Sequence, residues 1–158
     1  MIFKIFSKKE KKYFDVLIDT EDFDLIKHYK WNVTFNPHSN SYEIKTTIYY
    51  FEKQKTIYLH RLIMKAKKGE IVDHINHNKF DNRKSKLRIC TIRQNNMNKR
   101  LNKRNKSGVK GVCWNKKNKA FYVHVGNIYV GLTEDINKAK NMYNKKAKEI
   151  FKEYARLN

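Results

Sequence analysis

The sequence has few of the residues that constrain or interrupt a chain: two cysteines, one proline and five glycines in 158 residues. Cys90 and Cys113 form no CxxC pair, which excludes a disulfide framework and a four-cysteine zinc site. This cysteine content fits a reducing, intracellular compartment, and we expect a cytoplasmic location. No apolar run approaches the roughly 18 residues of a membrane-spanning helix, so no membrane partner is expected.

Acidic residues are also scarce, since 15 Asp and Glu face 36 Lys and Arg and leave a formal net charge of +21 at pH 7. Such a charge repels itself in a compact fold unless a polyanion neutralises it, so the expected partner is nucleic acid, taken here as double-stranded DNA. Residues 1–48 hold eight lysines against seven acids, whereas residues 49–105 hold sixteen basic residues against four acidic ones. The sequence therefore predicts a basic field over the last two-thirds of the chain.

Residues 1–55 are predicted to form a small α/β cap. YFDVLID (13–19) and YEIKTTIYYF (42–51) alternate between apolar and polar residues as strands do. EDFDLIKHY (21–29) carries acids in its first turn, which favours a short helix. The turn between these elements is expected at NPHSN (36–40).

Residues 56–105 are predicted to form a second part, rich in polar and basic groups. TIYLHRLIMKA (56–66) favours a strand that runs into a helix. A short strand at Ile71 and Val72, a polar loop, a second strand at 87–90 and a basic helix from about Thr91 follow. KRLNKRNKS (99–107) has five positive charges without apolar periodicity, so we expect a phosphate-contacting linker and a domain boundary near residue 105.

The polar loop contains side chains suited to phosphodiester hydrolysis. A histidine such as His74 can accept a proton from water near neutral pH. A hard cation such as Mg²⁺ prefers oxygen ligands, and Asp73 and Asn95 supply one carboxylate and one amide oxygen. Each of these residues alone is more often a satisfied turn group, and His60 is more often a core histidine. The occurrence of Asp73, His74 and Asn95 together in this order is what indicates a catalytic site.

The segment VDHINHNKFDNRKSKLRICTIRQN (72–95), with LHRL (59–62) upstream, resembles the HNH endonucleases of phage and intron homing type. The resemblance covers roughly residues 13–105 and implies a ββα-metal nuclease core. It further implies that His74 is the general base and that Asp73 and Asn95 hold one divalent cation, Mg²⁺ or alternatively Mn²⁺.

One position departs from that family pattern. Lys86 stands where the family usually has its middle asparagine, the residue that holds the loop between the two strands. We expect Asn82 to supply part of this loop bonding. Two readings stay open at this point: a working nuclease, and a non-catalytic DNA-binding protein derived from one.

Residues 106–158 are predicted to form a three-stranded antiparallel sheet packed by one helix. The strands are expected within GVKGVCW (108–114), KAFYVHVG (119–126) and NIYVGL (127–132). A helix from Thr133 carries an apolar stripe that predicts a packed face. Its members are Ile136, Ala139, Tyr143, Ala147, Ile150 and Tyr154.

This last segment resembles the plant apetala-type, or ethylene-response-factor, DNA-binding domain through Gly108, Gly111, Trp114, Tyr122 and Gly131. In that family the sheet enters the major groove, so the resemblance implies DNA contacts from the strands. A place in the core is the alternative for Trp114 and Tyr122. Across the whole chain the expected DNA contacts are Arg61, Arg83, Lys99, Arg100, Lys103, Arg104, Lys110, Trp114, Lys116, Lys117, Lys119 and Tyr122.

These observations predict an α+β protein in three parts: an N-terminal cap (1–55), a ββα-metal HNH nuclease core with a basic linker (56–105), and an apetala-type module (106–158). The expected function is that of a homing endonuclease, encoded by a mobile element of a virus or organelle, that nicks or cuts DNA. No protein partner is implied, and the chain is expected to be a monomer or weak dimer. A basic protein of an RNA particle would explain the charge but not the spacing of the candidate site.

Overall fold

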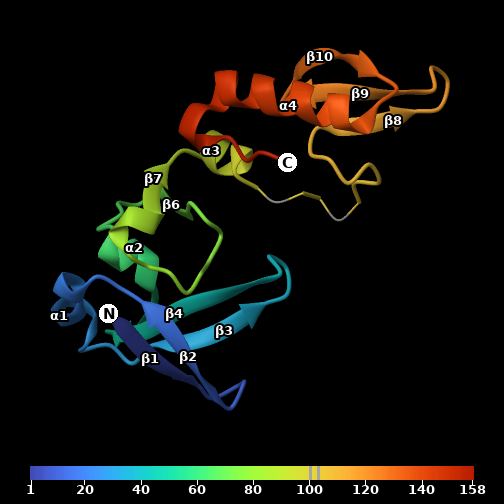
Figure 1. Ribbon diagram of the computed structural model, residues 1–158. Helices are drawn as coiled ribbons and strands as arrows, with labels where there is room; N and C mark the ends of the chain where they lie inside the picture. The colour runs from blue at the N-terminus through green and yellow to red at the C-terminus, as the bar shows by residue number, and fades with distance from the viewer. Residues whose placement is uncertain (100, 103) are drawn as a thin grey trace. The chain divides into compact units, whose positions relative to one another are not determined.

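The structure is a computed structural model that describes residues 1–158 except Arg100 and Lys103 (Figure 1). The expected DNA contacts at these two positions therefore lie outside the described residues. The chain forms two compact units, Met1–Thr91 and Ile92–Asn158, which we call the N-terminal unit and the C-terminal unit. The expected functional division at residues 55 and 105 stays a prediction.

The N-terminal unit consists of three small antiparallel sheets and two short helices. β1 pairs with β2, β4 lies between β3 and β5, and β6 pairs with β7. The elements are β1 (Ile2–Ser7), β2 (Lys12–Leu17), α1 (Phe23–Ile26), β3 (Asn32–Asn36), β4 (Ser41–Tyr50), β5 (Lys53–Tyr58), α2 (Leu59–Ile63), β6 (Ile71–His74) and β7 (Leu87–Cys90).

Most expected elements of this unit are confirmed. β2 and β4 occupy the two predicted strands, and β5 runs directly into α2 as the 56–66 pattern predicts. The helix expected over 21–29 is shorter, because a 3-10 turn at Thr20–Asp22 precedes α1 and the helix ends at Ile26. Trp31 Nε1 donates to the Ile26 carbonyl at 2.9 Å, so a side chain completes the end of this helix.

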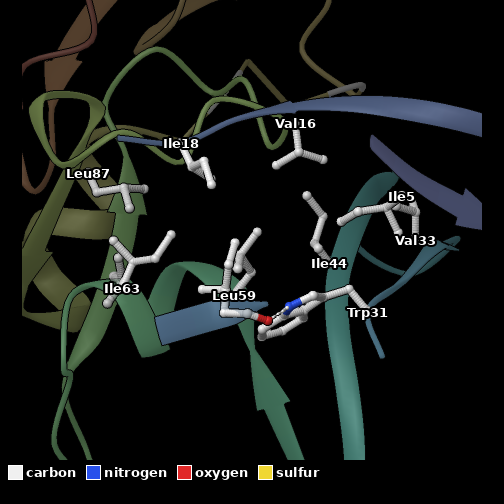
Figure 2. Packing of buried hydrophobic residues seen from close by; sticks show 11 residues of the cluster. Ile5, Val16, Ile18, Trp31, Val33, Ile44, Leu59, Ile63 and Leu87 are labelled. Atoms are coloured by element: carbon white, nitrogen blue, oxygen red, sulfur yellow. Dashed lines mark hydrogen bonds between the residues drawn. The ribbon is translucent and has the colours of Figure 1, made fainter. Parts of the chain in front are cut away.

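One hydrophobic core joins the cap to the nuclease-like segment. Figure 2 shows Ile5, Val16 and Ile44 from the first two sheets facing Leu59 and Leu87 from the later elements. All five side chains are buried, and burial of such side chains stabilises a fold by about 1.5–3 kcal/mol each. The segment with the HNH-like pattern is therefore packed as part of a larger unit.

The C-terminal unit contains α3 (Ile92–Met97), β8 (Val112–Asn115), β9 (Ala120–Val125), β10 (Ile128–Thr133) and α4 (Ile136–Phe151). β9 is the central strand of an antiparallel sheet in the order β10-β9-β8. Helix α4 packs along this sheet (Figure 1) and buries Ala139, Tyr143 and Ala147. The predicted sheet and helix are confirmed, except that Tyr154 lies beyond α4 in a 3-10 turn.

Within the described residues, every helix falls short of the length and apolarity that crossing a membrane requires.

Candidate active site

The β6–β7 hairpin places a buried carboxylate beside an arginine. The register sets Asp73 opposite Arg88, and Asp73 is 6% exposed. Arg88 donates to Asp73 Oδ2 through Nη2 at 2.9 Å and through Nε at 3.2 Å. A buried carboxylate needs such a partner, since an unpaired buried charge is strongly destabilising. Arg88 was not predicted from the sequence, because the register that sets it opposite Asp73 is a property of the folded hairpin.

His74 ends β6, is 1% exposed and has both ring nitrogens near polar groups. Asn82 Nδ2 donates to the Lys79 carbonyl at 3.0 Å, so Asn82 Oδ1 faces His74 Nε2 at 3.3 Å. Because Oδ1 only accepts, the proton of the neutral ring belongs on Nε2. The lone pair is then on Nδ1, where Lys79 Nζ lies at 3.3 Å.

The electrostatics keep this imidazole neutral. Burial lowers the pKa of His74 to about 4, and the charge of Lys79 contributes further. Burial also lowers the pKa of His60 to about 3, with His74 as the next cause. The two rings lie 5.2 Å apart between centroids. A neutral His74 at pH 7 has a lone pair that can accept a proton, which a general base requires.

The loop between β6 and β7 is anchored to the cap. Asn82 N donates to the Leu17 carbonyl, and Leu17 N donates to the Phe80 carbonyl, both at 2.7 Å. Ile75 N donates to the Lys86 carbonyl at 3.0 Å. Residue 86 therefore holds the chain next to His74 through its backbone carbonyl. Any residue type at this position can accept this hydrogen bond.

Three acidic residues of the cap, Asp19, Glu21 and Asp22, help to anchor this loop. Lys84 N donates to Asp19 Oδ2 at 2.7 Å, and Lys84 Nζ lies 2.6 Å from Glu21 and 2.7 Å from the buried Asp22. Arg83, an expected DNA contact, donates to both carboxylate oxygens of Asp81 at 2.7 and 2.8 Å. The cap thereby fixes the loop on both sides of Asn82.

A cavity of about 320 Å³ opens beside His74. Strand β4 and the β3–β4 turn form one wall, and the end of β5 and α2 form another. Its titratable lining residues are Tyr42, Glu43, Tyr58, His60, Arg61, His74 and Lys79. Arg61, an expected DNA contact, also donates to the carbonyls of Lys67 and Glu70. The cationic side of this cavity, with Lys79 half-buried in it, suits a phosphate.

The chemistry of Asp73 fits a hard divalent cation, because a buried carboxylate supplies the oxygen donor that Mg²⁺ prefers. Asn95 lies half-buried on α3, in the C-terminal unit, and its role as second ligand stays a prediction. In the part of the chain that the structure describes, no group of three or more His, Cys, Asp or Glu residues could hold a metal ion.

The expected DNA contacts of the C-terminal unit differ in their surroundings. Trp114 is 48% exposed, so the core alternative is wrong for this residue. Lys116, Lys117 and Lys119 are exposed in the turn between β8 and β9. Lys110 instead donates to the carbonyls of Met97 and Lys99 at 2.6 and 2.8 Å, and burial lowers its pKa to about 8. Tyr122 is half-buried and accepts from Asn118, whereas Lys99 and Arg104 are exposed.

Comparison with known proteins shows which proteins the chain resembles around Asp73 and His74. Residues 57–97 match the family model of HNH endonucleases, a family that typically uses a divalent metal. This region, which includes the buried pair Asp73 and His74, is therefore similar to HNH endonucleases. The chain is a distant homologue of an uncharacterized HNH endonuclease of Acanthamoeba polyphaga mimivirus, with 28% identity over 149 residues that cover 89% of this chain and 73% of the relative. No solved structure matches the chain significantly.

Proposed function

We propose that the protein is an HNH homing endonuclease that hydrolyses phosphodiester bonds of double-stranded DNA, with His74 as general base. The observation that carries this proposal is the fixed imidazole. Asn82 holds Nε2 as the protonated nitrogen, and burial keeps the ring neutral, so the Nδ1 lone pair is directed toward the Lys79 ammonium and the adjacent cavity. A base in this form is ready to accept a proton.

In the proposed reaction, His74 Nδ1 removes a proton from a water molecule. The water oxygen attacks the phosphorus, the bond from phosphorus to the leaving deoxyribose oxygen breaks, and this oxygen takes a proton from solvent water. Lys79 leaves Nδ1 as water and phosphate enter, and its ammonium then contacts a phosphate oxygen. Asp73 and Asn95 would hold one Mg²⁺, with Mn²⁺ as a substitute, and this ion would stabilise negative charge at the scissile phosphate.

The C-terminal unit would hold the duplex for the nuclease. Its exposed lysines in the β8–β9 turn and the exposed Trp114 support this role. We propose that its sheet contacts DNA as in the apetala-type domain, a likeness that rests on the glycine and aromatic positions and on the observed order of three strands and a helix. Lysine contacts phosphate well but lacks the planar fork that reads guanine.

A non-catalytic DNA-binding protein is the second candidate, favoured by Lys86 at the usual place of the middle asparagine. The geometry weakens this alternative. The Lys86 carbonyl accepts the bond from Ile75, and Asn82 meets the ring of His74. The bonds around the candidate base are therefore made without an asparagine at position 86.

Conversion of supercoiled plasmid to open circle tests the proposal. We expect nicking in Mg²⁺ or Mn²⁺ and none in EDTA. His74→Asn should slow single-turnover nicking by at least about 100-fold, because general bases contribute about 10²–10⁴-fold. The matched control is His77→Asn, three residues further along, which should keep most of the rate.

Two outcomes would contradict the nuclease. The first is plasmid binding without nicking in either metal. The second is nicking that His74→Asn leaves unchanged. If Lys86→Asn creates nicking that the natural sequence lacks, the second candidate is correct.

A further inference from the structure

The β4–β5 hairpin extends well beyond its sheet. Strand β3 pairs with β4 only from Asn36↔Ser41 to Asn32↔Lys45, whereas β5 pairs with β4 out to Tyr50↔Lys53. Among the described strands, β3 is not paired with residues 46–57, which therefore form a two-stranded ribbon that we call the β4–β5 arm. A two-stranded ribbon has little apolar burial of its own and is marginally stable in isolation.

The end of the arm carries three consecutive aromatic residues in solvent. Tyr49 is 77% exposed, Tyr50 is 71% exposed and Phe51 is 81% exposed. The rings of Tyr50 and Phe51 contact each other edge to face, with centroids 4.5 Å apart. Three adjacent aromatic side chains outside the core are unexpected for a surface turn, because large apolar groups in solvent mark interaction sites.

The turn at the end of the arm has an unusual backbone for its residues. Phe51 has φ 41° and Glu52 has φ 59°, so both central residues are in the left-handed region. Two-residue hairpin turns of this kind strongly prefer Asn-Gly or Asp-Gly. A phenylalanine there is strained, and such strain concentrates at functional sites. The turn holds the Phe51 side chain outward at the tip.

The charge beside these rings favours a polyanion as the partner. Lys53 lies directly opposite Tyr50, and Lys55 lies opposite Ile48. Residues that are opposite in an antiparallel pair share a face, as do alternate residues of one strand. Both lysines are exposed, so Tyr50, Lys53 and Lys55 form one face that combines an aromatic ring with two ammonium groups.

We infer that the β4–β5 arm is a wedge for duplex DNA, in which Phe51 inserts between base pairs from the minor groove while Lys53 and Lys55 contact phosphates. Apolar wedges of this kind unstack a base step and bend the duplex. A ring at a ribbon tip reaches the bases, and the lysines lie closer to the backbone. The inference depends on the proposed function only in taking DNA as the partner.

An assay of DNA unwinding tests the wedge without any cleavage. Relaxed closed circular plasmid is incubated with the protein and a metal-independent type I topoisomerase in EDTA, and the topoisomers are then separated. The natural protein should shift the linking-number distribution, because an inserted side chain unwinds the duplex. Phe51→Ala should reduce this shift by at least half at equal bound protein.

The matched control is Phe6→Ala, which removes another exposed phenylalanine, 45% accessible on β1. This variant should shift the distribution as the natural protein does. The double variant K53Q/K55Q should lower the salt slope of DNA binding by about 1–2, since each lost phosphate contact lowers it by about 0.9. K27Q/K30Q makes the same charge change elsewhere in the unit and should leave the slope unchanged.

Three outcomes would overturn the wedge. The natural protein could leave the linking number unchanged, Phe51→Ala could match the natural protein, or Phe51→Ala could dissociate a dimer in sedimentation equilibrium without affecting DNA. None of these depends on nicking. An unwinding protein that fails to nick would refute the proposed nuclease and keep the wedge, whereas a nicking protein that fails to unwind would do the reverse.

Discussion

The two units of this chain bury different kinds of side chain. Among the described residues, seven of the eight buried polar or charged side chains belong to the N-terminal unit, and Asn98 is the eighth. The C-terminal core consists of valines, alanines and Tyr143. Buried polar groups must be paired and therefore fix geometry, whereas apolar packing provides stability without fixing any reactive group.

This difference supports the N-terminal unit as the place of the proposed general base, whereas the proposed metal ligand Asn95 belongs to the C-terminal unit. Asp73, His74 and Asn82 are buried with defined partners, as a reacting group requires. Among its described polar side chains the C-terminal unit buries Asn98, and it exposes Lys116 and Lys117, which can contact phosphates. The N-terminal unit should therefore respond to protonation, and the C-terminal unit should respond mainly to changes in packing.

The largest predicted effect is on packing in the C-terminal unit. Gly111 has φ +71°, and a Cβ there would overlap the His124 carbonyl and the Tyr143 ring. Gly111→Ala should lower the free energy of unfolding by about 3 kcal/mol or more, from overpacking and backbone strain together. Thermal denaturation followed by circular dichroism measures this loss.

Gly108→Ala is the matched control for this prediction. Gly108 has nearly the same φ, +73°, but nothing lies within 4 Å of a Cβ there. It should cost only about 1 kcal/mol, the strain of a left-handed alanine. Equal losses in the two variants would show that Tyr143 does not pack tightly against the β8 end of the sheet.

The second prediction concerns pH and the N-terminal unit. The pKa of His74 is about 4 in the folded protein and about 6.5 in an unfolded chain. The unfolded chain therefore binds a proton first as the pH falls, and stability decreases below about pH 6.5. Between pH 7.5 and 5.5 the loss should be about 1 kcal/mol from His74, with a similar loss from His60.

Urea denaturation at pH 7.5 and 5.5 measures this loss. His74→Asn should make the difference between the two pH values smaller by about 1 kcal/mol. Amide exchange should show the loss in the N-terminal sheets and little change in β9. An equal loss of protection in both units would contradict the assignment of the titrating groups to the N-terminal unit.

Sequence patterns predicted the helices and strands better than the contacts between side chains. The 87–90 strand and the apolar stripe of α4 followed from periodicity alone. Strands β1 and β3 were not predicted, because each alternates over only five or six residues and its partner strand decides its burial. Within the candidate site, His74 and Asn82 were predicted. Arg88 and Lys79 were not, because cross-strand register and loop shape are long-range properties.

The smallest predicted effect tests whether the C-terminal unit depends on its helix cap as well as its core. Asp135 precedes α4, and its Oδ1 accepts from Asn137 N at 2.7 Å and from Lys138 N at 3.4 Å. Asp135→Ala should lower the free energy of unfolding by about 1 kcal/mol, because these amides lose their partner at the positive end of the helix.

Glu134→Ala is the matched control, because it removes the same charge one residue earlier. It should lower the free energy of unfolding by only a few tenths of about 1 kcal/mol. Asp135→Asn keeps the acceptor without the charge and should fall between the two. If Asp135→Ala and Glu134→Ala were equal in urea denaturation, the stability of α4 would come from its buried face alone.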